Sequence, residues 1–414
     1  MAKLNKFAAA IMLSFGALTV ATSAVAADKC PIEKRKNQAV GQSVGKKIQR
    51  SYKAYTEGNI DDALATLLEA SPKKDFDKAS VARMLGNFYA EKNQLDKAFT
   101  QLKQAADLDV LGGTEHADTL KLVGILAVQS EKFKVGISYF KKWLDFTCKQ
   151  DEDVYRLLAV SYSQVKDWDN AIKYADLAIK HAKKPKKDFY NVKVNAYYNK
   201  KELKNAVKVL ETAVELFPGE GSFWRQLSQF YLATEQYKKA LYTYDLTYKA
   251  GFLTAGSGIT RLAQLQARYG GPYHGAKLLE KHIKAGDVKK DKSSLRVVAG
   301  LFQNAKDMKK AADYFGEAAA IDNDAKLYLK QGRMLSSVQR YSQSIKAYDN
   351  AIKAGLKNPG EAYYELSLSY LNLKQYKSSL KNILLAKKDK KTKKHATSFE
   401  KYIREKARIN KVKL

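Results

Sequence analysis

Small residues recur along most of the chain at spacings of 33 to 38 residues, and a bulky residue usually follows four positions later. The small positions are Ala63, Ala98, Gly136, Ala171, Ala206, Ala240, Gly275, Ala311, Ser344 and Ser379. The positions four residues later are Leu67, Leu102, Phe140, Ala175, Leu210, Tyr244, Leu279, Phe315, Tyr348 and Ile383. Two helices can cross closely only where one of them carries almost no side chain, and residues i and i+4 share one helical face. The period therefore predicts ten stacked pairs of antiparallel helices.

Residues 189–251 contain two copies of a more detailed helix-turn-helix pattern. The later copy consists of Trp224, Leu227, Tyr231, Ala240 and Tyr244. The earlier copy, 34 residues before it, consists of Tyr190, Tyr197, Ala206, Leu210, Ala213 and Pro218. The two copies resemble the tetratricopeptide repeat, although Lys193, Val194 and Ser228 replace its usual leucine and glycines. This resemblance implies an all-α, right-handed superhelical solenoid of about ten helix pairs, closed by a C-terminal capping helix.

The first 26 residues have the features of an export signal. Lys3 and Lys6 precede a largely apolar run over residues 7–20, and residues 24–26 supply the small residues of a cleavage site. The apolar run is too short to cross a bilayer. We therefore predict a cleaved signal peptide and a periplasmic protein, soluble or peripherally membrane-associated. An uncleaved anchor is the alternative.

The chain has two cysteines, Cys30 and Cys148. In an oxidising compartment an even number of cysteines favours a disulfide. That bond would hold the start of the exported chain against the third repeat. Two unrelated thiols are the alternative, because a small apolar residue would also suit a helix end at Cys148.

The remaining chain divides into three parts. Residues 27–45 are a polar and basic lead-in, residues 46–388 are the repeat array, and residues 389–414 are a basic capping helix. Residues 387–414 contain 12 Lys and Arg against 3 Asp and Glu. A polar end cap is the simplest role for this segment, because solenoids need one. The alternative is a docking element for an anionic partner or membrane surface.

The formal net charge of the chain is +31. Such a balance often indicates nucleic-acid binding, but the predicted export and the lack of a nucleic-acid motif argue against it. The anionic partners that remain are acidic proteins, lipid headgroups and lipopolysaccharide phosphates. A lysine-rich solvated outer face explains the charge equally well.

No pattern of catalytic or metal-binding residues stands out. The five histidines form no ligand cluster, and the cysteines do not form a C-x-x-C motif. Common hydrolase and metalloprotease motifs do not occur. The glycines of residues 270–275 follow no strand, so they indicate a helix connection and not a phosphate loop. We expect no enzyme activity, no metal and no cofactor.

The first helix of each pair is expected to line a concave groove. The exposed positions of these helices are Arg83, Asn87, Lys121, Arg156, Asn191, Asn195, Arg225, Gln229, Gln264, Arg268 and Arg333. Amides can pair with a peptide backbone and guanidinium groups can bind carboxylates, so this surface suits an extended peptide. Arg83 and Asn87 faintly resemble the start of the carboxylate clamp of chaperone-binding tetratricopeptide domains, but Ile125 departs from that pattern. A merely hydrated inner face is the alternative.

Several strings extend the resemblance over most of the chain after residue 26. They are residues 38–41, 44–47, 85–87, 139–143, 214–218, 248–254 and 278–283. They resemble exported tetratricopeptide proteins of Gram-negative bacteria encoded beside a second TonB–ExbB–ExbD system. The resemblance implies a periplasmic adaptor that binds TonB-complex components and supports uptake of iron chelates across the outer membrane. A scaffold for cell-envelope or polysaccharide assembly is the alternative function.

Overall fold

The computed structural model describes residues 30–414, so the predicted signal peptide lies outside the described residues. In the described range the chain forms 22 helices and no strand. These helices belong to two compact units, which meet between Ala182 and Lys183.

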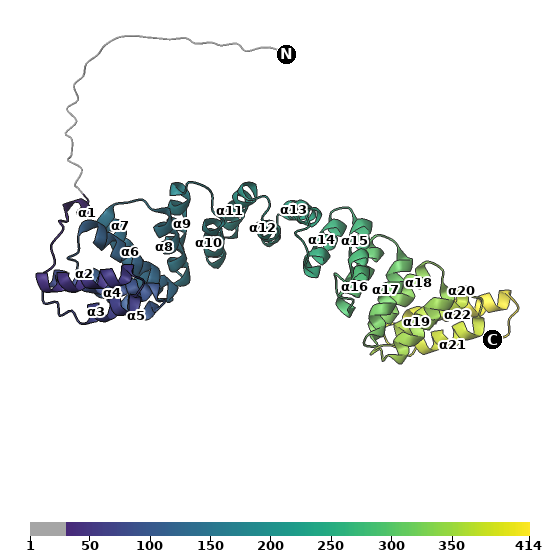
Figure 1. Ribbon diagram of the computed structural model, residues 1–414. Coiled ribbons are helices and arrows are strands. Elements are labelled where there is room, and N and C mark those ends of the chain that lie inside the picture. Colours follow the sequence, from purple (N-terminus) through teal and green to yellow (C-terminus); the bar gives the residue numbers. More distant parts are fainter. Residues whose placement is uncertain (1–29) are drawn as a thin grey trace, which may run out of the picture. The chain divides into compact units, whose positions relative to one another are not determined.

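The N-terminal unit contains one short helix and four helix pairs (Figure 1). Its helices are α1 (Pro31–Lys34), α2 (Gln42–Thr56), α3 (Ile60–Leu68), α4 (Asp75–Glu91), α5 (Leu95–Asp107), α6 (Gly113–Gln129), α7 (Phe133–Thr147), α8 (Glu152–Gln164) and α9 (Trp168–His181). Each pair packs on the next in chain order.

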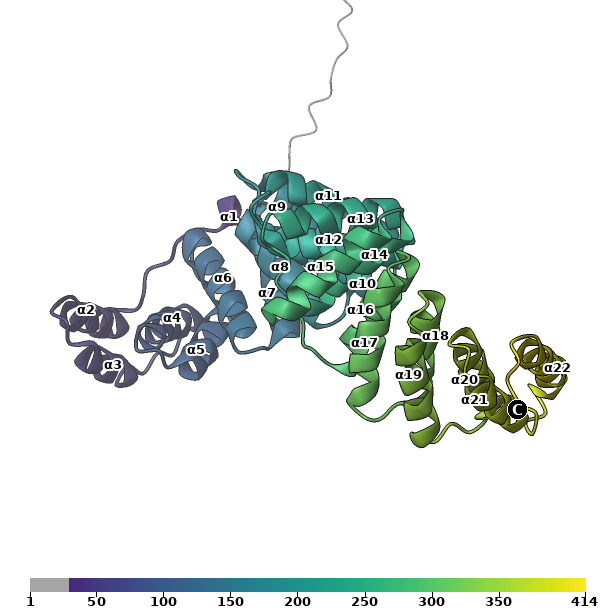
Figure 2. The same cartoon turned by 90° about the vertical axis from the view of Figure 1, so that its right-hand side faces the viewer.

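The C-terminal unit contains six helix pairs and a final helix (Figure 2). Its helices are α10 (Lys187–Asn199), α11 (Leu203–Leu216), α12 (Gly221–Ala233), α13 (Tyr237–Lys249), α14 (Gly256–Arg268), α15 (Pro272–Ala285), α16 (Lys292–Asn304), α17 (Met308–Ala320), α18 (Ala325–Ser337), α19 (Tyr341–Lys353), α20 (Gly360–Asn372), α21 (Tyr376–Ala386) and α22 (Lys393–Ile409). Helix α22 packs on α21 and buries Ala396, Ile403 and Ala407.

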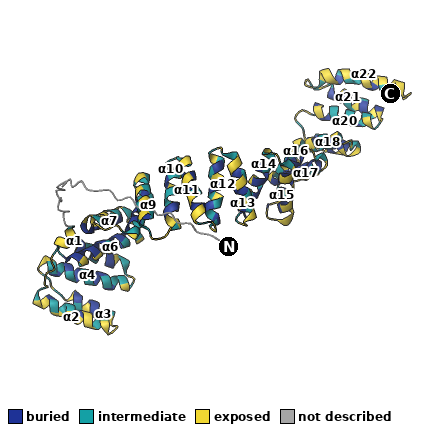
Figure 3. Ribbon diagram, turned by 90° about the horizontal axis from the view of Figure 1, so that it is seen from above, coloured by how far each residue is buried: buried dark blue, intermediate teal, exposed yellow. Residues whose placement is uncertain are grey.

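All ten small positions predicted from the period are buried, on the second helix of each pair. Figure 3 marks buried residues in dark blue along the helices. The bulky positions are buried too, and Leu67, Phe140, Leu210 and Tyr348 are fully enclosed. Because each small residue lets the two helices of a pair approach closely, the core runs between the helices of every pair. The predicted all-α solenoid of ten helix pairs is confirmed.

Two glycines show how close this approach is. A Cβ atom on Gly275 would collide with the backbone carbonyl of Ala263, on the other helix of the same pair. A Cβ atom on Gly332 of α18 would collide with the ring of Tyr348 on α19. At both positions the neighbouring helix occupies the space of a side chain, so glycine is required by packing.

The turn inside each pair repeats one backbone conformation. A residue with positive φ lies five positions before every small position: Gly58, Asn93, Glu131, Lys166, Lys201, Glu235, Gly270, Lys306, Gln339 and Lys374. Eight of these ten residues are not glycine, although the left-handed region favours glycine. The turn geometry is therefore imposed by the packing of the two helices, because local sequence preference alone would not select it.

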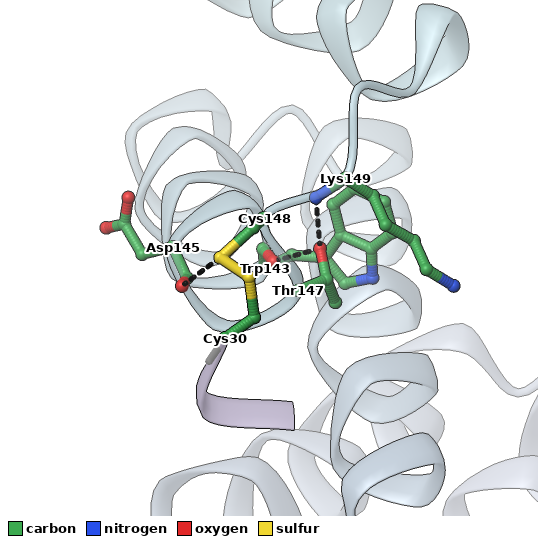
Figure 4. The surroundings of a disulfide bond; sticks show 6 residues. All are labelled: Cys30, Trp143, Asp145, Thr147, Cys148 and Lys149. Atoms are coloured by element: carbon green, nitrogen blue, oxygen red, sulfur yellow. Dashed lines mark hydrogen bonds between the residues drawn. A yellow bond between two sulfur atoms is a disulfide. The ribbon is translucent and has the colours of Figure 1, made fainter. Parts of the chain in front are cut away.

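Residues 30–41, which we call the strap, run along the N-terminal unit in the direction opposite to the repeats. A disulfide joins Cys30 to Cys148 at the end of α7, with a Cα–Cα distance of 6.0 Å (Figure 4). The Arg35 guanidinium donates to the backbone carbonyl of Asp109 at 2.6 Å and forms an ion pair with its carboxylate at 2.8 Å. At the other end the Gly41 amide donates to Asp77 on α4 at 2.8 Å. The strap thus ties the third helix pair to the second and continues directly into α2 of the first.

Within residues 30–414, the structure contains no helix with the length and apolarity needed to span a bilayer.

Candidate functional site

The N-terminal unit has a cavity of about 640 Å³ on the side formed by the first helices of its first pairs. Helices α2 and α4 supply most of its wall, Glu115 of α6 supplies one edge, and strap residues 38–40 close it. The lining residues are Gln38, Ala39, Val40, Ile48, Tyr52, Tyr55, Phe76, Ser80, Arg83, Met84, Asn87, Phe88, Glu91 and Glu115.

Aromatic side chains form the apolar part of this cavity. Tyr55 and Phe88 stack with their ring centroids 4.8 Å apart, and Tyr52 lies beside Tyr55 at 6.4 Å. The Tyr52 side chain is 58% exposed, so a bound group can reach it. A hydrogen bond to Glu91 raises the pKa of the Tyr55 hydroxyl and keeps it protonated. The cavity therefore offers a rigid apolar floor next to a carboxylate.

The structure brings Arg83 and Asn87 together in this cavity, on the face of α4 predicted from their spacing. Arg83 Nη1 forms an ion pair with Glu115 at 3.0 Å. The Asn87 side chain has no hydrogen-bond partner among residues 30–414. An amide can donate and accept hydrogen bonds at the same time. Asn87 is therefore a polar group of the cavity that can both donate to and accept from a bound backbone.

The next two predicted residues do not line this cavity. Lys121 of α6 forms an ion pair with Asp151 at 2.8 Å and lies 5.2 Å from the centroid of the Trp143 ring. Burial would raise the pKa of Asp151, but hydrogen bonds from Lys121 and from the Val154 amide lower it below its ordinary value. Asp151 also caps the N-terminus of α8. The Lys121 side chain is therefore engaged in an ion pair that joins two helix pairs.

This arrangement recurs in both units. A basic residue on or near a first helix pairs with an acidic residue at the start of the next first helix, about one repeat later. Such pairs are Arg83–Glu115, Lys121–Asp151, Lys187–Glu220, Lys292–Asp324 and Arg333–Glu361. Sequence reasoning missed these acidic partners. Their recurrence about one period after each basic residue was the signal that could have found them.

The predicted residues of the C-terminal unit have separate surroundings. Arg225 donates to the backbone carbonyl of Phe252 at 3.1 Å, and Arg268 lies 4.4 Å from the centroid of the Tyr237 ring. Gln229 lines a cavity of about 540 Å³ that also contains Tyr237 and Arg261. Asn195 accepts a hydrogen bond from Asn199 at 3.0 Å. Two of these arginines are therefore held by neighbouring groups of their own unit.

Three further predicted residues are exposed or lie close to an acidic residue of their own helix. Asn191 and Gln264 are exposed on α10 and α14. Arg156 of α8 lies 3.7 Å from Asp153 on the same helix. A single groove that joins all the predicted residues stays a prediction.

Sequence reasoning did not place the strap at the cavity. Gly112 and Gly113 allow the strap to approach the loop before α6, because a Cβ atom on either glycine would collide with Asn37 or Ile32. His116 is buried beneath the strap, where its Nε2 lies 2.9 Å from the Asp109 carboxylate. In the part of the chain that the structure describes, no group of three or more His, Cys, Asp or Glu residues is placed to hold a metal ion.

The fold defines the class of the protein: it is an all-α solenoid of stacked helix pairs. A family model described as ChAPs, the Chs5p-Arf1p-binding proteins, matches residues 50–246. No curated protein matches the chain.

Three similar solved structures are of tetratricopeptide proteins. The TPR2AB domain of yeast Sti1 in complex with an Hsp90 peptide is 17% identical, with a TM-score of 0.33, over 61% of this chain and 96% of that chain. A tetratricopeptide protein from Parabacteroides merdae is 12% identical, with a TM-score of 0.36, over 68% and 93%. YrrB, a tetratricopeptide protein with an unusual peptide-binding site, is 17% identical, with a TM-score of 0.37, over 50% and 100%.

Proposed function

We propose that this protein is a scaffold that binds an extended segment of a partner protein in the cavity between α2, α4 and the strap. The observation that carries the proposal is the Asn87 amide, which has no hydrogen-bond partner among residues 30–414 and lines a cavity with an aromatic floor. The amide pairs with the peptide backbone of the segment, and an apolar side chain of the segment packs on Tyr55 and Phe88. Binding of this kind requires no catalytic group.

The polar edge of the cavity selects the charge of the bound segment. Glu115 neutralises part of the Arg83 guanidinium, while Arg83 Nε and Nη2 keep donors for a ligand. Glu91 adds a second carboxylate to the wall. The site therefore favours an uncharged or mixed-charge segment over a strongly acidic one.

Within this role, we propose a periplasmic adaptor of a TonB-type energy-transduction complex for uptake of iron chelates and similar nutrients. The likeness of residues 38–47, 139–143 and 278–283 to proteins encoded with such systems supports this assignment. The disulfide is consistent with an oxidising compartment. A scaffold for cell-envelope or polysaccharide assembly is the second candidate.

Site-specific crosslinking in cells tests the proposal. A photoreactive amino acid replaces Tyr52 at the cavity, or Tyr402 on α22, which is 47% exposed and serves as the control. We expect TonB, ExbB, ExbD or receptor segments to be captured from position 52 and not from position 402. Asn87→Ala should reduce this capture about tenfold, the loss of one or two hydrogen bonds in a cavity.

Two outcomes would contradict the proposal. Capture that is equal from positions 52 and 402, or that is unchanged by Asn87→Ala, would exclude the cavity as the binding site. Capture of envelope-assembly proteins alone, together with retention on peptidoglycan or polysaccharide, would favour the second candidate.

A further inference from the structure

The positive charge is distributed very unevenly between the two units. Residues 183–414 contain 47 Lys and Arg against 21 Asp and Glu, whereas residues 30–182 contain 24 against 21. The net charges are therefore +26 and +3. Residues 387–414 supply +9 of this charge, so residues 183–386, with six helix pairs, carry +17 against +3 for the four pairs of residues 30–182. The excess is therefore larger than the number of repeats explains.

First and second helices of this unit each carry a net charge of +7, but lysines and arginines are divided between them. The second helices of the C-terminal unit (α11, α13, α15, α17, α19 and α21) carry 14 lysines, seven acidic residues and no arginine. The second helices of the N-terminal unit (α3, α5, α7 and α9) carry seven lysines and seven acidic residues. Arginines of the repeats in the C-terminal unit lie mainly on first helices, for example Arg225, Arg268 and Arg333.

Helices α13 and α15 combine lysines with exposed tyrosine and leucine. The exposed residues, at steps of four, four and three on each helix, are Lys238, Tyr242, Leu246 and Lys249 on α13 and Tyr273, Lys277, Lys281 and Lys284 on α15. We call these eight residues the α13/α15 face. A hydrogen bond of 2.9 Å between Tyr248 and His282 holds the two helices side by side.

The α13/α15 face keeps its lysines and its apolar groups accessible to solvent. Tyr242, Leu246 and Tyr273 are 69%, 51% and 49% exposed. Lys238 and Lys281 have no carboxylate within 4.0 Å among residues 30–414. Lys249 pairs with Asp245, and Lys277 and Lys284 pair with Glu280, but all three remain exposed. Exposed Tyr and Leu side chains between accessible lysines do not stabilise the isolated chain, and they indicate a surface that is covered by a partner.

We propose that the α13/α15 face docks onto the surface of an anionic lipid bilayer. Lysine ammonium groups contact the lipid phosphates, and the long lysine stems lie along the interface. Tyr242 and Tyr273 lie at the headgroup level, and Leu246 enters the acyl boundary. This surface is separate from the peptide cavity, so the chain can bind a protein segment and a membrane independently.

The composition of the face favours a bilayer over other anionic partners. Arginine is favoured where carboxylates, phosphates or bases are paired bidentately, and the second helices of this unit contain no arginine. Lysine acts as a compact charge without directional pairing, which suits a fluid layer of headgroups. Exposed Leu246 contributes affinity only where an apolar phase lies beneath the charges.

Sedimentation of the exported chain with vesicles tests the proposal. Vesicles of phosphatidylcholine with one-third phosphatidylglycerol should bind the protein, and vesicles of phosphatidylcholine alone should not. Neutralising Lys238, Lys249 and Lys281 to Gln should weaken binding about a hundredfold, since each basic residue near an anionic surface contributes about fivefold. Tyr242→Ser with Leu246→Ser should weaken binding about tenfold without changing its salt dependence.

Two control variants each remove three positive charges from surfaces outside the α13/α15 face. Lys134→Gln, Lys141→Gln and Lys180→Gln alter exposed lysines on second helices of the N-terminal unit. Lys390→Gln, Lys391→Gln and Lys393→Gln alter the basic region before and at the start of α22. Both should bind vesicles within twofold of the unchanged protein. All substituted residues are on the surface, and unchanged circular dichroism will show that the variants are folded.

Three results would overturn the proposal. The first is a failure of the unchanged protein to sediment with anionic vesicles at physiological salt. The second is a loss in either control variant as large as that in the α13/α15 variant, which would assign binding to net charge or to the C-terminal segment. The third is equal competition by double-stranded DNA or polyglutamate combined with no effect of the Tyr242 and Leu246 changes, which would define a general polyanion site. The crosslinking test of the cavity with Asn87→Ala does not depend on any of these three vesicle results.

Discussion

Glu280 is a buried carboxylate that joins two neighbouring second helices, α15 and α17. Only 4% of this residue is exposed. It accepts hydrogen bonds from Lys310 at 3.0 and 3.1 Å, from Lys284 at 3.2 Å and from the Tyr314 hydroxyl at 3.1 Å, and it forms an ion pair with Lys277 at 3.2 Å. Glu280→Gln removes the only negative charge in this cluster and leaves three lysines facing one another.

The loss of folding free energy expected for Glu280→Gln follows from the pKa of Glu280. Burial would raise this pKa, but the hydrogen bonds from Lys310, Lys277, Lys284 and Tyr314 lower it from 4.5 to about 2. Because the folded pKa is the lower one, the stabilisation is present above pH 4.5 and is lost as the pH falls towards 2. A difference of this size corresponds to about 3 kcal/mol at neutral pH. We expect Glu280→Gln to cost about that much, within the range for broken buried ion pairs.

Hydrogen exchange measured by mass spectrometry is the suitable assay, because repeat arrays open locally. At pH 7, amides of α15 and α17 in Glu280→Gln should exchange about a hundredfold faster, the equivalent of about 3 kcal/mol. Glu317→Gln is the matched control, since Glu317 lies on α17, forms an ion pair with Lys290 at 2.8 Å and is 42% exposed. This control should change stability by less than about 0.5 kcal/mol.

A pH series separates the charge of Glu280 from its packing. The unchanged protein should lose protection of α15 and α17 between about pH 4.5 and 2, while Glu280→Gln should show a weaker dependence over that range. Equal exchange in Glu280→Gln and Glu317→Gln at pH 7 would refute the reasoning. A parallel pH dependence in both proteins would show that other carboxylates carry the acid sensitivity.

Two further predictions concern packing and covalent closure. Gly332→Ala should destabilise the C-terminal unit by about 2 kcal/mol, because its Cβ would collide with the Tyr348 ring. Gly300→Ala on α16, where the space is open, should stabilise that unit by about 1 kcal/mol, and urea unfolding of both variants will show whether the signs differ as expected. Replacing Cys30 and Cys148 by Ser should destabilise the N-terminal unit by up to about 5 kcal/mol, since the bond closes a loop with a sequence separation of 118. Unchanged thermal unfolding of that variant would contradict the entropic argument.

The sequence was sufficient to predict the ten helix pairs because each pair depends on a local rule. In that rule a small residue is followed four positions later by a bulky one, and Ala175 departs from it because alanine occupies the bulky position. Ala175 is fully buried, and the volume that it lacks is supplied by Tyr174, whose ring stacks on Tyr162 at 5.4 Å. An aromatic residue next to the bulky position can therefore fill the same space, and the spacing of the repeats does not change.

The candidate site was only partly predictable. Arg83 and Asn87 could be assigned to one helical face from their spacing of four residues. Their environment depends on contacts over longer distances, because Glu115 belongs to another helix pair and the strap carries no period. The net charge was visible in the sequence, whereas the segregation of lysines to second helices required the helix boundaries.

The disulfide gives the N-terminal unit an unusual mechanical property. Tension applied at Cys30 passes through the sulfur atoms directly to Cys148, at the end of α7. The chain between these residues, including the helix pairs α2/α3 and α4/α5, is a closed loop that carries none of the load. A protein pulled from this end would keep its cavity intact while α8 and the helices after it bear the force, and reduction would transfer the load to the strap and α2.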